Sequence, residues 1–513
     1  MKNISILTLP AILIGFVLGT SALAMELDWS GQFRSEFNII SNYSMDSSDT
    51  AANFDATRAG GNGYYVPGGG SDNANFQTLF LRLRPKLIVN DNIYIKSEWW
   101  LGSPVFGFFG NAVPYTYDQR QFYSTQSRGS LVSAQRFWAD ILTDFGTLQI
   151  GRAPLNWGLG IVWNSGDGLW DRYASTGDVI RLVSKFGSFT LTPSFISYSS
   201  GNNLGGSCTG AACTPGAGSG GVSDYSLMLK YENIDEDFEG GVNFVKRLAG
   251  ANQDPVAGHL GLVGVPAGVA AGGSPASMNY NTWDLFGRKK LGKIKLGGEL
   301  PIVTGNIGGV EYSTYAFAGE VDWKANDAWE FGLKAGHAPG QPNLLAAAPD
   351  RYKVFYFNPN YHLGMIMFNY QLANMAGPNT LNNPTIAETT LKSPYDNPIV
   401  NTNYLGLSGV FHTDKWAFRG AWVYAKALEA AVNGENFFNP WQRRVVGPAV
   451  KDQGTSLGWE MDLGATLQWD DSLQFGWDSG FFFPGDFFAF SNTLADNATS
   501  MVFATTAKIG IAF

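Results

Sequence analysis

Histidines are the first residues to test for chemistry, because a hydrolase embedded in a membrane needs a histidine beside a serine or a carboxylate. The chain has four, His259, His337, His362 and His412, and none lies in a recognisable nucleophile motif. The acidic stretches 166–168 and 235–237 lack the ligand spacing of a calcium loop and are typical of ordinary turns. The sequence therefore predicts no enzyme, no metal site and no cofactor.

Charged side chains form a second group, because they recur within segments whose alternate positions are apolar. Leu79, Leu81 and Leu83, for example, alternate with Arg82 and neighbouring cations. An Arg or Lys at lipid depth costs ~2–4 kcal/mol, so in a membrane barrel these positions must face the interior. The residues predicted to line the interior on this basis are Arg82, Arg84, Lys86, Arg136, Asp140, Arg181, Arg288, Glu320, Asp322, Glu460 and Asp462.

These interior charges allow two interpretations. The wall is more basic early in the chain and more acidic late, which predicts a transverse field across a water-filled pore. Alternatively, the charges pair across strands and satisfy one another in a crowded interior.

The elements that must position these charges are predicted to be β-strands of a transmembrane barrel. Only 15% of the residues are charged, 14% are aromatic and 63 are glycine. After residue 24 there is no long apolar stretch that could form a membrane helix. Low charge without helical spans is typical of a barrel, in which every strand shows one face to lipid. A net charge of −9 argues against nucleic acid or another large polyanion as a partner.

Residues 1–24 are predicted to be a cleaved signal peptide. Lys2 precedes an apolar run, and Ala22 and Ala24 form a cleavage site of small residues. No composition break or linker follows, so residues 25–513 are predicted to form one domain. Because export leads to an oxidising compartment, Cys208 and Cys213 are expected to form one small disulfide in an external loop.

Turn residues divide the rest of the chain into hairpins. Tight turns are predicted near residues 91, 145, 187, 236, 292, 326, 414 and 470, with longer Gly-, Asn-, Ser- and Pro-rich segments between the hairpins. Together with a first strand at 26–40 and a last strand at 500–513, they predict an all-β, antiparallel up-and-down barrel of about 18 strands. If residues 352–357 and 362–372 also cross the membrane, the number becomes 20. Short turns are expected in the periplasm and long loops outside the cell.

Two further sequence features concern the strands themselves. Pro85, Pro193 and Pro301 fall inside predicted strands, where a bulge or a shifted boundary is expected. The last strand alternates apolar residues and ends on Phe513. It resembles the terminal signal that the barrel-assembly machinery reads in outer-membrane proteins, so that machinery is an expected partner.

Two segments resemble the alginate-export family of outer-membrane porins. They are residues 151–160, GRAPLNWGLG, followed by DVIRL at 178–182, and residues 457–462 followed by FFPGD at 482–486. The resemblance implies a monomeric barrel of 18 strands, with Arg152 and Arg181 in the interior and the loop between them near the mouth. This chain mixes both signs of charge where the family's exporter is strongly basic, which favours a general or differently selective porin.

The leading hypothesis is a channel in the outer membrane of a Gram-negative bacterium that passes ions and small hydrophilic solutes by diffusion. A dedicated saccharide exporter or importer is the first alternative. A surface protein for adhesion or phage attachment is the second. Outer-membrane lipid and lipopolysaccharide are the expected surroundings of any of the three.

Overall fold

The regular secondary structure is almost entirely β-strand in the computed structural model, which describes residues 26–43, 45, 73–102, 104, 132–199, 222–249, 278–307, 310–343, 351–372, 395, 397–440, 444–490, 492, 496 and 498–513. The strands are β1 (Glu26–Ser41), β2 (Ala74–Asn90), β3 (Ile93–Gly102), β4 (Val132–Thr143), β5 (Gly146–Pro154), β6 (Thr176–Phe186), β7 (Phe189–Ser199), β8 (Val222–Asn233), β9 (Phe238–Ala249), β10 (Met278–Leu291), β11 (Ile294–Ile307), β12 (Val310–Tyr315), β13 (Phe317–Lys324), β14 (Trp329–Ala338), β15 (Arg351–Tyr352), β16 (Thr402–His412), β17 (Trp416–Ala427), β18 (Asn436–Asn439), β19 (Arg444–Pro448), β20 (Ser456–Gln468), β21 (Leu473–Pro484) and β22 (Val502–Ala512). A short helix, α3 (Asp486–Ala489), follows β21.

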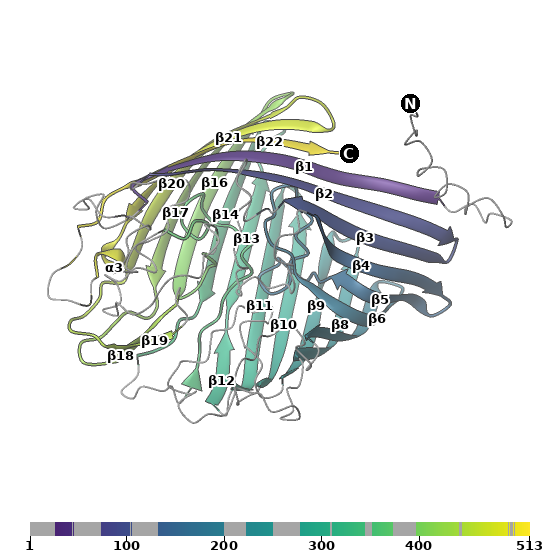
Figure 1. Cartoon of the computed structure of the whole chain (residues 1–513), viewed down its shortest axis with the longest axis horizontal. Helices are drawn as coiled ribbons and strands as arrows, with labels where there is room; N and C mark the ends of the chain where they lie inside the picture. The colour runs from purple at the N-terminus through teal and green to yellow at the C-terminus, as the bar shows by residue number, and fades with distance from the viewer. Residues whose placement is uncertain are drawn as a thin grey trace, which may run out of the picture.

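These strands form an antiparallel sheet that closes into a barrel. β1 pairs with β2 on one side and with β22 on the other, in a register that sets Gln32 opposite Ala512. β12 and β13 are two parts of one wall strand beside β11, so the barrel has 18 strands. Figure 1 shows β1, in purple, lying beside the yellow β22 where the two ends of the sheet meet.

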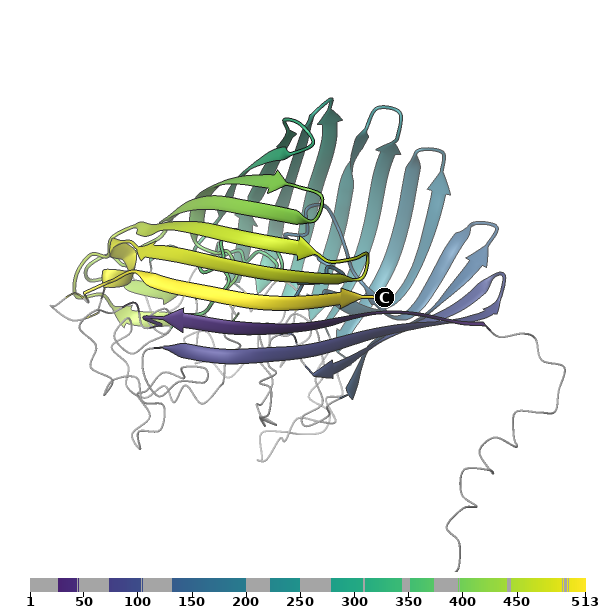
Figure 2. The same cartoon turned by 90° about the horizontal axis from the view of Figure 1, so that it is seen from above.

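The two ends of the barrel differ in their connections. Tight turns join β2–β3, β4–β5, β6–β7, β8–β9, β10–β11, β13–β14, β16–β17 and β20–β21, as the turn residues predicted. They lie together at one end of the barrel, as Figure 2 shows, which we call the short-turn end; the opposite end is the long-loop end. Turn chemistry is local, which is why the sequence was sufficient to place these turns.

The choice of 18 strands over 20 is confirmed. Of the two ambiguous segments, only Arg351 and Tyr352 are in a strand, the two-residue β15, which runs parallel to β12. Residues 354–357 are 0–2% exposed and lie inside the barrel. Their side chains are buried on all sides, so their apolar character did not signify a lipid-facing strand.

The expectation of a bulge or a shifted boundary at the three strand prolines is wrong. Pro85, Pro193 and Pro301 lie within β2, β7 and β11, and the register on both sides of each proline is unchanged. Only the ladder to one neighbouring strand is interrupted, as at Pro301, where β12 ends and β13 begins. In an antiparallel sheet the backbone N–H and C=O of one residue form hydrogen bonds with only one of the two adjacent strands. A proline therefore interrupts the hydrogen bonds to that strand and leaves those to the strand on its other side intact.

The outer face of the barrel carries large apolar side chains. Leu227, Trp283, Leu463 and Trp477, from different parts of the wall, are 46–60% exposed. Among the described residues, no helix has the length and hydropathy needed to cross a membrane.

The main apolar core lies inside the barrel. It combines inward-facing wall residues with two stretches of chain that fold into the lumen, residues 155–175 and residues 353–372. We call these inner segment A and inner segment B. They follow β5 and β15, respectively.

Candidate functional site: a lumen narrowed by two inner segments

Inner segment A is held to the wall through its backbone. Glu299 on β11 is 1% exposed, and its Oε2 accepts the N–H groups of Leu159, Gly160 (3.0 Å) and Ile161 (3.4 Å). Gly158 has φ +59°, and a Cβ there would lie 2.5 Å from the same oxygen. Gly158 is therefore required by a close approach of backbone to a buried carboxylate.

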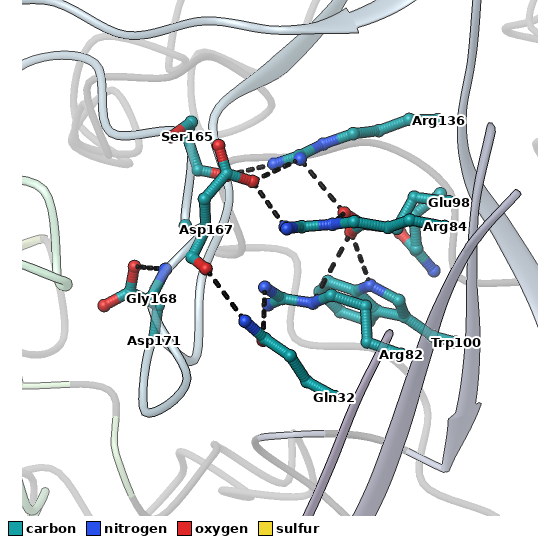
Figure 3. A network of polar contacts seen from close by, with 12 residues as sticks. Gln32, Arg82, Arg84, Glu98, Trp100, Arg136, Ser165, Asp167, Gly168 and Asp171 are labelled. Carbon is teal, nitrogen blue, oxygen red and sulfur yellow. Dashed lines mark hydrogen bonds and ion pairs between the residues drawn. The ribbon is translucent and has the colours of Figure 1, made fainter. Parts of the chain in front are cut away.

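The tip of inner segment A is fastened to β2 and β4 by ion pairs, shown in Figure 3. Asp167 accepts hydrogen bonds from Arg84 (2.5 Å) and Arg136 (2.9 Å). Glu98 lies behind them, with Arg84 at 2.8 Å, Arg136 at 3.1 Å and Arg82 at 3.8 Å. We call these five residues the latch, which places three guanidinium groups around two carboxylates.

The latch is charged at neutral pH. Burial alone would raise the pKa of Asp167, but Arg136 and Arg84 outweigh it and hold that pKa below its usual range. Asp167 is therefore an anion that ties inner segment A to the basic part of the wall.

A second ion pair fixes the other end of inner segment A. Arg172 forms a bidentate pair with Glu36 on β1, with N–O distances of 2.5 and 3.1 Å. Its guanidinium also lies 3.6 Å from the ring centroid of Tyr395. Nearby, Arg34 donates to the carbonyl of Leu169 (2.5 Å). One cation thus joins the wall, inner segment A and a residue far along the chain.

Inner segment B is bound by the acidic part of the wall. Glu460 on β20 is 0% exposed and accepts the N–H groups of Ile366 (2.6 Å) and Met367 (2.5 Å). Two residues further along the strand, Asp462 accepts the N–H of Met365 (3.1 Å). The carboxylates thus satisfy peptide groups that a buried, irregular segment would otherwise leave unpaired.

The two inner segments also bind each other. The side chain of Asn360 accepts the N–H of Tyr173 (2.9 Å), and that of Asn358 donates to the hydroxyl of Ser175 (3.0 Å). The backbone N–H of Asn358 donates to the carbonyl of Ile161 (2.8 Å). The segments therefore form one unit that narrows the lumen from the inside.

Most residues predicted to line the interior do face it. Strand register and contacts place on the inner face Arg82, Arg84, Lys86, Arg136, Asp140, Arg181, Arg288, Glu320, Asp322, Glu460 and Asp462. Their contribution to conduction stays a prediction.

Arg152 is an exception, and its predicted place inside the barrel is wrong. It lies opposite Phe137 on β4, which is 58% exposed on the outer face, and opposite Asp178 on β6. Arg152 forms a bidentate pair with Asp178 at 2.7 and 3.0 Å. Leu148 and Ile150 precede Arg152 at alternate positions, so the dyad pattern itself assigns Arg152 to the outer face. The nearby Asp178 neutralises it close to the long-loop end.

The interior charges are largely paired, as the second interpretation held. Asp140 lies 2.7 Å from Lys96, Arg288 lies 2.7 Å from Glu239, and Glu320 lies 2.9 Å from Lys334. Arg181 donates to Gln149, while the ammonium of Lys86 lies 5.0 Å from the ring centroid of Tyr94. The early basic and late acidic parts of the wall meet inner segments A and B, respectively, rather than facing each other across open water.

Other predicted residues fall elsewhere. His337 faces outward, stacked on Tyr315 at 5.2 Å and hydrogen-bonded to Asn403 (2.8 Å). His362 belongs to inner segment B. His259, the signal peptide, and Cys208 with Cys213 lie outside the described residues. Within the described part of the chain, no group of three or more His, Cys, Asp or Glu residues could hold a metal ion.

Open space remains around the inner segments. A central cavity of about 390 Å³ lies between them and strands β1, β14, β16, β17 and β20–β22, where Gly406, Ser408 and Ala421 have small side chains that leave space. A latch cavity of about 300 Å³ lies between Asp167 and strands β1 to β4. A rim cavity of about 610 Å³ lies at the short-turn end and is lined by charged residues that include Lys295 and Asp322.

Sequence reasoning missed the inner segments and their ligands on the wall. Glu36, Asp167, Arg172 and Glu299 carry the attachment, and none was singled out as functional. The closely spaced Gly158 and Gly160 were the available signal, because paired glycines indicate a close approach of backbone.

At its C-terminal end the chain closes the barrel through Phe513. Gly31 and Phe513 exchange backbone hydrogen bonds of 2.7 and 3.0 Å, and the Phe513 ring occupies the space where a Cβ of Gly31 would lie. Phe513 is 57% exposed, and its role as an assembly signal stays a prediction.

Comparison with known proteins finds similarity only among solved structures. No family model and no curated protein matches the sequence. OccK2 (OpdF) of Pseudomonas aeruginosa is 10% identical, with 95% of this chain and 98% of that chain covered and a TM-score of 0.48. OpdK of the same organism, solved with vanillate, is 9% identical over 95% and 98%, with a TM-score of 0.47. OmpT of Vibrio cholerae is 8% identical over 96% and 99%, with a TM-score of 0.35. The closed barrel is established here by the strand pairing itself, and the solute is argued from this chain's side chains.

Proposed function

We propose that this chain is a channel in the outer membrane of a Gram-negative bacterium that passes ions and small hydrophilic solutes by passive diffusion. The observation that carries the proposal is the set of cavities inside a closed barrel, two beside the inner segments and one at the short-turn end, whose linings include many charged and polar side chains. Such a lining favours hydrated solutes, whereas the apolar outer face suits lipid.

The orientation and partners belong to the same proposal. The short-turn end faces the periplasm and the long-loop end faces the outside, with lipid and lipopolysaccharide around the wall. The barrel works as a monomer and is inserted by the barrel-assembly machinery, which reads the strand that ends on Phe513. Because the interior charges are paired, selectivity between anions and cations is weak.

Planar-bilayer recording of the purified mature chain tests the proposal. Stepwise current increases in KCl are expected, with a reversal potential close to zero in a salt gradient. A folded barrel that inserts and carries no current would refute the channel. It would favour a surface protein that acts through its long loops.

A further inference from the structure

The central cavity has a lining of mixed chemistry. The wall strands β14, β16, β17 and β20–β22 contribute polar side chains that include Lys334, Ser408, Arg419 and Asp478. Inner segment B contributes the apolar side chains Leu363 and Met365 beside its polar residues. A volume of about 390 Å³ lies within the range of small-ligand sites, ~300–1,000 Å³, and such sites combine apolar surface with a few directed polar groups.

Most charges of this cavity are already paired. Asp478 lies 3.0 Å from Arg419 and 2.5 Å from Lys508, and Lys334 lies 2.9 Å from Glu320. An anionic ligand would have to compete with these carboxylates for the cations, and a cationic ligand would face the reverse problem. The cavity therefore favours a ligand without net charge that can add hydrogen bonds to intact ion pairs.

Hydroxyl and amide groups complete the lining. Ser408 and Thr506 on the wall contribute hydroxyls, and Asn369 and Tyr370 of inner segment B contribute an amide and a phenol. Each of these groups can donate or accept a hydrogen bond. His362 also belongs to the lining, and burial, with Arg172 and Lys334 nearby, lowers its pKa to about 3, so its ring is neutral at physiological pH.

We propose that the central cavity is a binding site for an uncharged polyhydroxylated solute, a sugar or a polyol. A hydroxyl both donates and accepts, so one class of group matches the ion pairs at Asp478, the hydroxyl of Ser408 and the amide of Asn369. The C–H face of such a solute packs against Leu363 and Met365. This inference rests on the proposed channel and assigns its solute class.

Block of the channel current by sucrose tests the inference on the full mature chain in KCl. Sucrose should halve the current at a concentration on the order of tens of millimolar, an affinity typical of a weak site. Acetate and putrescine, as small anionic and cationic probes, should need at least about tenfold more, because each must displace an existing ion-pair partner.

Two variants locate the site. Asp478→Asn weakens both ion pairs, and Ser408→Ala removes one hydroxyl and adds no atom. Each should raise the half-blocking sucrose concentration about fivefold, the effect of losing one hydrogen bond. Ser30→Ala is the matched control, because Ser30 lines the latch cavity instead, and block by sucrose should be unchanged.

The outcomes separate this site from the channel itself. Acetate or putrescine blocking at a lower concentration than sucrose would overturn the site, as would unchanged sucrose block in Ser408→Ala. Migration of unheated samples in gels shows that each variant has folded, and Ser408→Ala decides the matter if Asp478→Asn does not fold. Absence of current in the wild-type chain would refute the channel instead.

Discussion

Replacing Asp167 with Asn should loosen inner segment A and make the channel current noisier. The substitution keeps the shape of the side chain and removes the charge that faces Arg84 and Arg136 at 2.5 and 2.9 Å. A buried charge-assisted hydrogen bond contributes ~1.5–3 kcal/mol. Because the Asp167 side chain is 49% exposed, solvent screening reduces the expected loss to ~1–2 kcal/mol in total.

The lost free energy of the latch determines how often inner segment A is released from the wall. A change of ~1–2 kcal/mol alters an equilibrium ~5–30-fold, so the released state of inner segment A should become that much more frequent. The attachments at Glu299 and Arg172 remain, so the segment moves at its tip and stays inside the barrel.

Single-channel recording at constant voltage measures this effect as the frequency of brief current transitions. Asp171→Asn is the matched control, because Asp171 lies in the same segment and its carboxylate accepts the N–H of Gly168 without reaching the wall. Figure 3 shows both acids. Equal transition frequencies in Asp167→Asn and the wild type, in a folded channel, would refute the latch.

Four further predictions concern other parts of the structure. The folded-state pKa of Asp167 is lowered, so the latch is complete above the ordinary Asp pKa of about 3.9 and is lost only as pH falls through the lowered value. Wild-type current noise should therefore be equal at pH 7 and pH 5. A rise in noise by pH 5 would contradict this. Gly158→Ala places a Cβ at positive φ against a carboxylate oxygen, so thermal unfolding followed by circular dichroism should show a loss of at least ~1–2 kcal/mol, and unchanged stability would contradict that contact. Arg84→Ser should shift the reversal potential in a salt gradient towards cations, whereas Arg152→Ser, on the outer face, should leave it unchanged; a shift of equal size in both would mean that Arg152 contributes to the pathway. Deleting Phe513 should lower the amount of folded protein in the outer membrane more than the conductance of each channel, and normal membrane levels would argue against the terminal signal.

Sequence reasoning worked where structure is decided by neighbours along the chain. Alternation of apolar and polar residues requires a strand with one face towards lipid, and a polar turn such as Asp470-Asp471 forces the chain back on itself within a few residues. The number of strands then followed from pairing the first segment with the last. Arg152 supports the same rule. The family resemblance placed it in the interior, whereas its position two residues after the outward-facing Ile150 correctly indicates the outer face.

The candidate site depended on contacts that no local pattern contains. Asp167 meets Arg84 across 83 positions of sequence, and Ile366 meets Glu460 across 94. An alternating strand determines that a charge points inward, but the partner depends on which segments enter the lumen. Buried peptide groups of those segments had to find acceptors, and Glu299 and Glu460 supply them. The sequence by itself thus determined the barrel, its two ends and the inward direction of its charges. Only the tertiary structure decided that those charges hold the inner segments that narrow the lumen. Burial requires each charge to be paired, but it does not specify which residue is the partner.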